Sequence, residues 1–228
     1  MGMYDLNINA TLLNYNFKDY KAVCINIDSD INNYTDSYDI EVKDNMYTKI
    51  CIRLKEENIS RFYIKTIPYY DIISILVKDN NSMEVATGWD IDVITIDIGV
   101  DTNIKRGLIK NCIHKGIFIE IPLRGGLYDR DNWLRNVNRI LGITKGKNTI
   151  ITSGAKEKHE LKHLRDIKEF LKIFNFKEER IKEITEENPK KLLKNAALKR
   201  FSANGVVNNL DEGNLKRNFI LNEYKYLL

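Results

Sequence analysis

The sequence predicts an α/β fold, built as a single parallel β/α barrel of about seven strands. Short apolar runs recur along the chain, and several are almost continuously hydrophobic, as in Ile72–Val77 and Val93–Ile96. Such runs are typical of parallel strands that are covered on both faces. Most intervals between them are long enough for a helix, as βαβ units require. Seven units in one domain favour a closed barrel, and an open doubly wound sheet is the alternative.

The predicted strands divide the chain into a barrel and a tail. The polar, Asp- and Asn-rich stretch 29–47 predicts a surface loop. The segment 82–89 is short but can form one or two helical turns. We expect residues 1–200 to form the barrel and residues 201–228 to form a C-terminal tail that docks on the barrel or on a partner, because residues 203–214 break the helical pattern. The strands are predicted at residues 3–8, 22–27, 49–54, 71–77, 93–98, 117–121 and 149–152.

The composition indicates one large domain with a proper core. The chain has 228 residues, 43% of them hydrophobic, and only three prolines. No apolar run reaches the ~18–20 residues of a membrane span, and the N-terminal residues do not form a secretory signal, so we expect no membrane partner. Cys24, Cys51 and Cys112 are widely spaced, which favours buried thiols in a reducing compartment over disulfides or zinc ligands.

The two halves of the chain carry opposite charge. Residues 1–103 hold 9 Lys and Arg against 17 Asp and Glu, whereas residues 104–228 hold 27 against 15. A basic half of this size attracts polyanions, which include RNA, DNA and phospholipid. Solvated helix faces also carry many lysines, so the charge alone leaves nucleic-acid binding and simple solvation as open alternatives.

Histidines and amides are the first candidates for a metal site. Chemistry in a parallel barrel sits where the strands end, and there the first predicted strand offers Asn7 and Asn9, which are unusual ligands for a transition metal. His159 and His163 are four residues apart and would share a helix face, but lysines and an arginine surround them. We therefore predict no metal site at this pair.

Three aspartates are further candidates for a metal site, and the standard catalytic motifs are absent from the sequence. Asp92, Asp97 and Asp101 could hold Mg²⁺ only with matching carboxylates from other strands, and solvated strand ends are the simpler interpretation. The chain contains neither a Gly-rich phosphate loop nor a GxSxG nucleophile motif. We predict that the chain has no catalytic residue and no cofactor.

The basic residues are better organised. The last predicted strand ends in the small residues Ser153-Gly154-Ala155, which let a phosphate approach the backbone. An amphipathic helix is expected next, with Leu161 to Phe174 supplying its apolar face, and a second helix is expected to end at Asn188-Pro189. A solvated helix remains the alternative to an RNA-binding face. The candidate RNA-binding residues are Lys105, Arg106, Lys115, Ser153, Lys156, Lys158, Lys162 and Arg165.

Several motifs resemble one protein family in the same order. The most specific is the run from Gly146 to Ala155, followed by Glu160-Leu161, Arg165-Asp166 and Glu187-Asn188-Pro189. Tyr4-Asp5-Leu6-Asn7-Ile8 is similar to that family's opening strand. Over roughly residues 3–200 the chain resembles the 30-kDa protein subunit of ribonuclease P and RNase MRP.

This resemblance implies a fold and a function. The fold would be a TIM-like barrel of the PHP type that has lost its metal ligands, with Asn7 where a histidine is expected. The function would be a non-catalytic subunit that braces the catalytic RNA for 5′ maturation of precursor tRNA, beside a small ferredoxin-like subunit. A metal-dependent PHP-type phosphoesterase is the alternative. The polar loop and the tail resemble eukaryotic members, which implies the nucleus, or the cytoplasm for an archaeal source.

Overall fold

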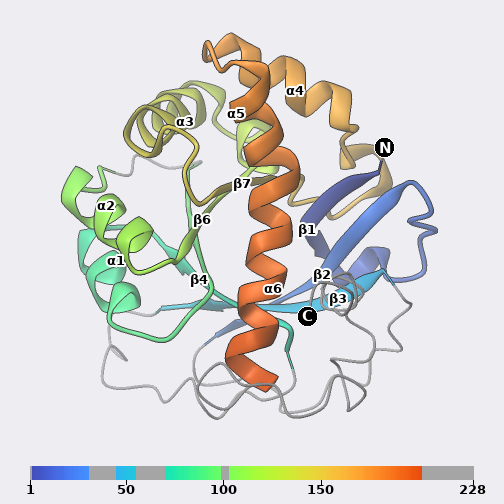
Figure 1. The fold of residues 1–228 in the computed structure, drawn as a ribbon, viewed down its shortest axis with the longest axis horizontal. Helices are drawn as coiled ribbons and strands as arrows, with labels where there is room; N and C mark the ends of the chain where they lie inside the picture. The colour runs from blue at the N-terminus through green and yellow to red at the C-terminus, as the bar shows by residue number, and fades with distance from the viewer. Residues whose placement is uncertain (1, 31–44, 55–69, 99–102, 202–228) are drawn as a thin grey trace, which may run out of the picture.

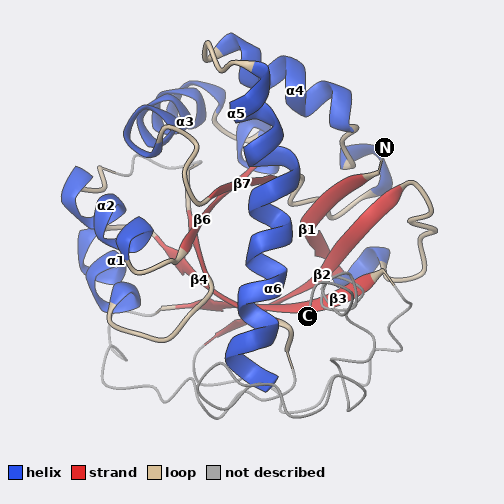
Figure 2. Cartoon of the chain, in the orientation of Figure 1, coloured by secondary structure: helices blue, strands red, loops and turns tan. Residues whose placement is uncertain are grey.

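The computed structural model describes residues 2–30, 45–54, 70–98 and 103–201, and it confirms the α/β barrel. Seven strands form one sheet in chain order, and each neighbouring pair is parallel. Figures 1 and 2 show the strands curving around a common centre with helices outside them. Ile8 forms an isolated parallel bridge with Ala155, and the Asn9 N–H donates to the Ala155 carbonyl at 2.8 Å. The first and last strands therefore nearly close the ring.

The observed strands match the predicted runs closely. Two of them extend into the predicted loop 29–47: Ser29 and Asp30 still pair with the third strand, which itself begins at Met46. The loop prediction was wrong at both ends, because the backbone ladder continues beyond the apolar residues. Its central part, 31–44, lies outside the described residues. The strands are β1 (Met3–Asn9), β2 (Tyr20–Asp30), β3 (Met46–Arg53), β4 (Ile72–Val77), β5 (Val93–Ile96), β6 (Phe118–Pro122) and β7 (Thr149–Thr152).

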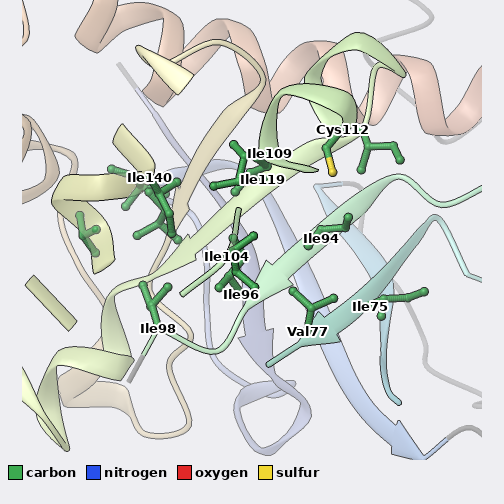
Figure 3. Close-up of a cluster of buried hydrophobic side chains, with 14 of the residues drawn as sticks. Ile75, Val77, Ile94, Ile96, Ile98, Ile104, Ile109, Cys112, Ile119 and Ile140 are labelled. Carbon is green, nitrogen blue, oxygen red and sulfur yellow. The ribbon is translucent and has the colours of Figure 1, made fainter. Parts of the chain in front are cut away.

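Four helices cover the outside of the barrel: α1 (Asn80–Thr87), α2 (Arg106–His114), α3 (Arg130–Thr144) and α4 (Leu164–Ile173). The short helix expected within 82–89 is α1, and it begins at an Asp79 cap that accepts the Ser82 N–H at 2.7 Å. Isoleucines dominate the layer between strands and helices, since β-branched side chains pack well on a pleated surface. Figure 3 shows this layer, with Ile75, Val77, Ile94, Ile96, Ile109, Cys112, Ile119 and Ile140 among its members.

The connection between β1 and β2 covers its part of the barrel without an α-helix. It contains the short 3₁₀ helix η1 (Ala10–Leu12) and then a loop that buries Phe17. The Phe17 ring meets those of Tyr15 and Tyr20 edge-on, with centroids 5.0 and 5.6 Å apart. These side chains pack on the outer face of β1 and β2, which completes the hydrophobic core there.

The chain after α4 forms one continuous helical rod, α5 (Glu178–Lys182), the π-helical η6 (Glu183–Glu187) and α6 (Asn188–Phe201). The prediction that a helix ends at Asn188-Pro189 was wrong. Pro189 has no N–H to donate to the preceding turn of an α-helix. The Asn188 N–H bonds instead to the Glu183 carbonyl, five residues back, so a π turn carries the helix into the proline without a break. The Asn188 amide also donates to the carbonyls of Gly146 at 2.9 Å and Thr149 at 2.8 Å, which holds the rod against β7.

Helix α6 crosses the N-terminal end of the barrel, as Figure 1 shows. Its Leu192, Leu193 and Ala196 join a buried cluster with side chains from the barrel interior. At its end, Lys199 donates to the Ile91 carbonyl at 3.0 Å, and Arg200 pairs with Asp92 at 2.5 Å. The apolar plug, this hydrogen bond and this ion pair close that end. Residues after 201, which include the predicted tail, lie outside the described part of the chain, and no described helix is long and apolar enough to span a membrane.

Candidate nucleic-acid interface

A cavity of about 410 Å³ lies at the opposite, C-terminal end of the barrel, where the strands end. We call it the mouth. Active sites of parallel barrels occupy this position, so its chemistry bears directly on function. Four cations and two carboxylates line it, together with three asparagines from β1 and β2. Its polar lining includes Asn7, Asn9, Asn26, Asp28, Arg53, Lys78, Asp97, Arg124, Tyr128 and Lys156.

The three aspartates singled out in the sequence do not come together. Asp92 lies at the N-terminal end, 4% exposed, where it accepts the Ile73 N–H at 2.9 Å and pairs with Arg200. Asp97 lies at the mouth, and Asp101 lies outside the described residues. The interpretation of Asp92 as a solvated residue at a strand end was therefore wrong. Across the described ranges, no group of three or more His, Cys, Asp or Glu side chains is arranged to hold a metal ion.

A layer of polar side chains fills the barrel interior. The Lys49 ammonium and the Glu120 carboxylate are 2.6 Å apart, and both side chains are at most 1% exposed. Thr95 and Thr152 donate their hydroxyls to Glu120, the latter at 2.8 Å. The sequence analysis treated Lys49 only as part of a strand. A charged residue at an inward position of an otherwise apolar strand was the signal that could have identified it.

At the seam between β1 and β7, the buried Asp5 carboxylate takes the place of a backbone acceptor. Its Oδ1 accepts the Ser153 N–H at 3.1 Å, while its Oδ2 has no hydrogen-bond partner. Burial raises the pKa of Asp5 to about 7, although the hydrogen bonds from Ser153 and Asn7 act in the opposite direction. Ser153 is 1% exposed, and its hydroxyl accepts the Ala155 N–H. Its polar groups are thus used inside the protein.

The segment after β7 is not the helix that the sequence predicted. Residues Lys158–Glu160 form the 3₁₀ turn η5, and the α-helix begins only at Leu164. His159 lies in the turn and His163 is the residue that caps α4, so the two do not share a helix face. The apolar face of α4 was predicted correctly from Leu164 onward, since Ile167 and Leu171 are buried. Leu161 packs on the β1–β2 side instead.

Glu160 organises the loop on this side of the mouth. Its carboxylate accepts the N–H groups of Lys156 at 2.7 Å and Glu157 at 3.2 Å, and it forms an ion pair with Arg124. Partial burial raises the pKa of Glu160, but these hydrogen bonds and the Arg124 charge outweigh burial and hold it below its ordinary value. Arg124 in turn donates to the Tyr128 hydroxyl. The Glu160 carboxylate therefore holds the backbone of Lys156 and the side chain of Arg124 in place.

The seven basic candidate residues occupy three places. Lys156, Lys158 and Arg165 are exposed and Lys162 is partly exposed; all four lie within the ten residues from 156 to 165, and Lys158 lies 5.5 Å from the Tyr15 ring centroid. We call these four the basic ridge. Lys105 and Arg106 are exposed at the start of α2, which is also at the C-terminal end of the barrel. Lys115 lies at the other end of α2, and its ammonium donates to the Thr87 carbonyl at 2.6 Å.

With this geometry in place, comparison with known proteins decides the family. The family model described as RNase P subunit p30 matches residues 2–201, which run from β1 to the end of α6. The chain belongs to the RNase P subunit p30 family. The resemblance read from the motifs is thereby confirmed.

Curated members of the RNase P subunit p30 family and other relatives align with much of the chain. The Dictyostelium discoideum protein "Ribonuclease P protein subunit drpp30" is 28% identical over 82% of this chain and 56% of its own length. The Schizosaccharomyces pombe "Probable ribonuclease P protein subunit 3" is 20% identical over 91% of this chain and 94% of its own. The Arabidopsis thaliana "Protein GAMETOPHYTE DEFECTIVE 1" is 28% identical over 60% of this chain and 25% of its own. The chain thus spans about half the length of the Dictyostelium discoideum relative and a quarter of the length of the Arabidopsis thaliana relative.

A solved structure gives the same fold independently. A chain in a cryo-EM structure of archaeal ribonuclease P with mature tRNA superposes with a TM-score of 0.70 at 16% identity, over 92% of this chain and 98% of that one. At this identity the likeness establishes the fold alone. It agrees with the nearly closed barrel of the RNase P subunit p30 family.

Some mouth residues of this family member were missed in the sequence. Asn26, Arg53, Lys78 and Tyr128 line the cavity, yet they were not candidates. Asn26 lies within β2, Arg53 is the last residue of β3, and Lys78 directly follows β4. The signal for Asn26, Arg53 and Lys78 was the alternation of inward positions, counted two residues at a time from the buried layer toward the strand end.

Proposed function

We propose that the chain is a non-catalytic protein subunit of ribonuclease P, and also of RNase MRP. The observation that carries this proposal is the family match over residues 2–201, which covers all seven strands and the helices that surround them. In this proposal the RNA performs the reaction, 5′ maturation of precursor tRNA. The protein would bind and brace the catalytic RNA.

The chemistry of the mouth supports binding over catalysis. Its first strand presents the amides of Asn7 and Asn9, and the Asn9 oxygen already accepts the Thr11 N–H at 3.1 Å. Asp28 is 3.4 Å from Arg53 and also accepts from Asn26 at 2.9 Å. Amides and paired carboxylates are poor donors for a catalytic metal, whereas exposed cations suit phosphate. A PHP-type phosphoesterase remains the alternative, and metal-dependent phosphatase activity of the pure chain would establish it.

The proposed partners are the ribonuclease P or MRP RNA, precursor tRNA and other protein subunits of the particle. A small ferredoxin-like subunit is the specific protein partner that we propose. Exposed apolar side chains on the outer helices, such as Leu134 on α3 and Ile173 on α4, are candidates for protein contact. We further propose that residues 201–228 dock on the barrel or on a partner, and that the particle is nuclear, since the relatives named above are eukaryotic.

The experiment that tests this function is recovery of RNA with the chain from its own cells. The tagged full chain is purified at moderate salt, and the RNA that accompanies it is sequenced. We expect one structured RNA with a ribonuclease P-type catalytic core, and cleavage of precursor tRNA by the purified particle. Recovery of no specific RNA would overturn the proposal.

A further inference from the structure

An aromatic ring stands at the mouth in a fixed orientation. Tyr128 is 72% exposed and lines the cavity. Its hydroxyl accepts from Arg124, whose guanidinium carbon lies 5.4 Å from the ring centroid, and Arg124 is held by Glu160. Arg124 therefore faces the ring from one side. An exposed ring held by a partly buried ion pair is suited to stack with a planar group.

Two cations at the same cavity make no hydrogen bond or close ion pair with another described residue. Lys78, the residue after β4, and Lys156, three residues after Ser153, are both exposed and line the mouth. Within the described part of the chain, neither ammonium makes a hydrogen bond or a close ion pair. Both are available to a phosphate. The other two cations, Arg53 and Arg124, are engaged by Asp28 and Glu160.

A buried acceptor in the wall of the cavity has no donor among the described residues. Asn26 is 5% exposed and lines the mouth, and its amide nitrogen donates to Asp28 at 2.9 Å. An ionised carboxylate only accepts, so this contact fixes the amide with its nitrogen toward Asp28. The Asn26 Oδ1 is then left buried, with no hydrogen-bond partner in the structure. A donor from a ligand or from an ordered water would satisfy a buried oxygen of this kind.

We propose that the mouth takes up one unpaired nucleotide of an RNA strand. The base stacks on the free face of Tyr128, the flanking phosphates approach Lys78 and Lys156, and the ribose 2′-hydroxyl donates to Asn26 Oδ1. The nucleotide must be unpaired, because a paired base is stacked inside its duplex and exposes no face to a side chain. The cavity of about 410 Å³ is within the size range of small-molecule sites.

Other occupants fit these groups less well. A free phosphate would use the lysines and leave Tyr128 and Asn26 without a role. An apolar protein side chain would place six charged groups against hydrocarbon, which is unfavourable. This inference rests on the proposed function, since it names the part of the RNA that the subunit holds and the place where it is held.

The test uses the purified full chain with a labelled ten-nucleotide unstructured RNA and a DNA of the same sequence. Affinity is measured by fluorescence anisotropy for the wild type, Tyr128→Ala and Tyr128→Phe. We expect roughly tenfold weaker RNA binding for Tyr128→Ala, from the loss of one base stack, and near-wild-type binding for Tyr128→Phe. Leu127→Ala is the matched control, because Leu127 is the adjacent residue, 61% exposed, and we expect it to leave binding unchanged.

Two further measurements locate the nucleotide. A 4-thiouridine RNA should cross-link to the tryptic peptide 125–130, which contains Tyr128. The wild type should bind RNA about fivefold more tightly than DNA, and Asn26→Leu should remove this preference, because the 2′-hydroxyl loses its acceptor. Equal binding of RNA and DNA by the wild type would contradict the assigned role of Asn26.

The results separate this inference from the proposed function. If Tyr128→Ala binds the RNA as the wild type does and peptide 125–130 carries no cross-link, the mouth does not hold a nucleotide. The same conclusion follows if the wild type does not bind the probe. Recovery of the ribonuclease P-type RNA from cells would then leave the subunit function intact. Failure of that recovery overturns the function itself.

Discussion

The Asp5 carboxylate accepts the Ser153 N–H at 3.1 Å across the seam where the first strand meets the last. Along most of the barrel, backbone carbonyls accept the N–H groups of the neighbouring strand, although the carboxylates of Asp71 and Asp92 also accept strand N–H groups, from Thr48 at 2.8 Å and from Ile73 at 2.9 Å. At the seam a side chain also does so, and Asp5 borders the shift in register, between Asp5 and Ile8, in the pairing of β1 with β2. The closure of the ring thus depends in part on a titratable group that has been removed from water.

This seam predicts a pH-dependent stability. Burial raises the pKa of Asp5 to about 7 from 3.8, so the folded state keeps a proton that the unfolded state releases. The resulting stabilisation is complete below pH about 4 and is lost as the pH rises through about 7. Relative to Asp5→Asn, the wild type should therefore lose up to about 4 kcal/mol of unfolding free energy over this window. Urea unfolding of both proteins across the window measures the difference, and two parallel pH profiles would contradict it.

The buried Lys49–Glu120 pair predicts an asymmetric double-mutant cycle. Lys49→Met leaves the Glu120 carboxylate buried with only hydroxyl donors, and such uncompensated charges cost about 3–5 kcal/mol. Adding Glu120→Gln removes the charge and keeps an acceptor for Thr95 and Thr152. The double variant should recover most of the lost unfolding free energy. Denaturant unfolding of the two single variants and the double variant tests this, and additive losses would exclude an interaction between the two side chains.

The sequence predicts the barrel because hydrophobic runs encode buried parallel strands directly. The strands predicted at 71–77 and 93–98 are observed at Ile72–Val77 and Val93–Ile96, because a continuous hydrophobic run is typical of a strand that is buried on both faces. The predicted helix end at Asn188-Pro189 failed because proline chemistry is local, whereas the π turn depends on side-chain contacts with Gly146 and Thr149 that are distant in sequence.

The candidate site was less predictable than the fold. The cations after Ser153 were found from their density, but their arrangement depends on Glu160, whose carboxylate turns the chain before α4 can begin. Tyr128 gave no sequence signal, because its significance comes from its position at the cavity. Lys115 was grouped with Lys105 by nearness in sequence, and helix α2 places the two at opposite ends of the barrel.

Asn188 should be a stability determinant of the helical rod. Its amide donates to two carbonyls at the start of β7 and is 4% exposed. Asn188→Ala removes both bonds, so the unfolding free energy should fall by about 1–3 kcal/mol. Asn188→Asp should cost more, because a carboxylate cannot donate and would face two carbonyl oxygens. Lys191→Ala, exposed on the same helix, is the control for thermal unfolding, and an Asn188→Ala protein as stable as this control would refute the assignment.

The basic ridge predicts a change in the salt dependence of RNA binding. Reversal of Lys156, Lys162 and Arg165 to Glu removes up to three phosphate contacts, and each lost contact lowers the slope of log affinity against log salt by about one unit. The slope should therefore fall by about three units, and affinity should fall most at low salt. The matched control reverses three exposed lysines elsewhere, Lys110, Lys177 and Lys182. Titrations at several salt concentrations with the RNA recovered from cells give both slopes. If the two triple variants lose the same number of units, the effect is one of net charge, and the ridge is not the surface that meets the phosphates.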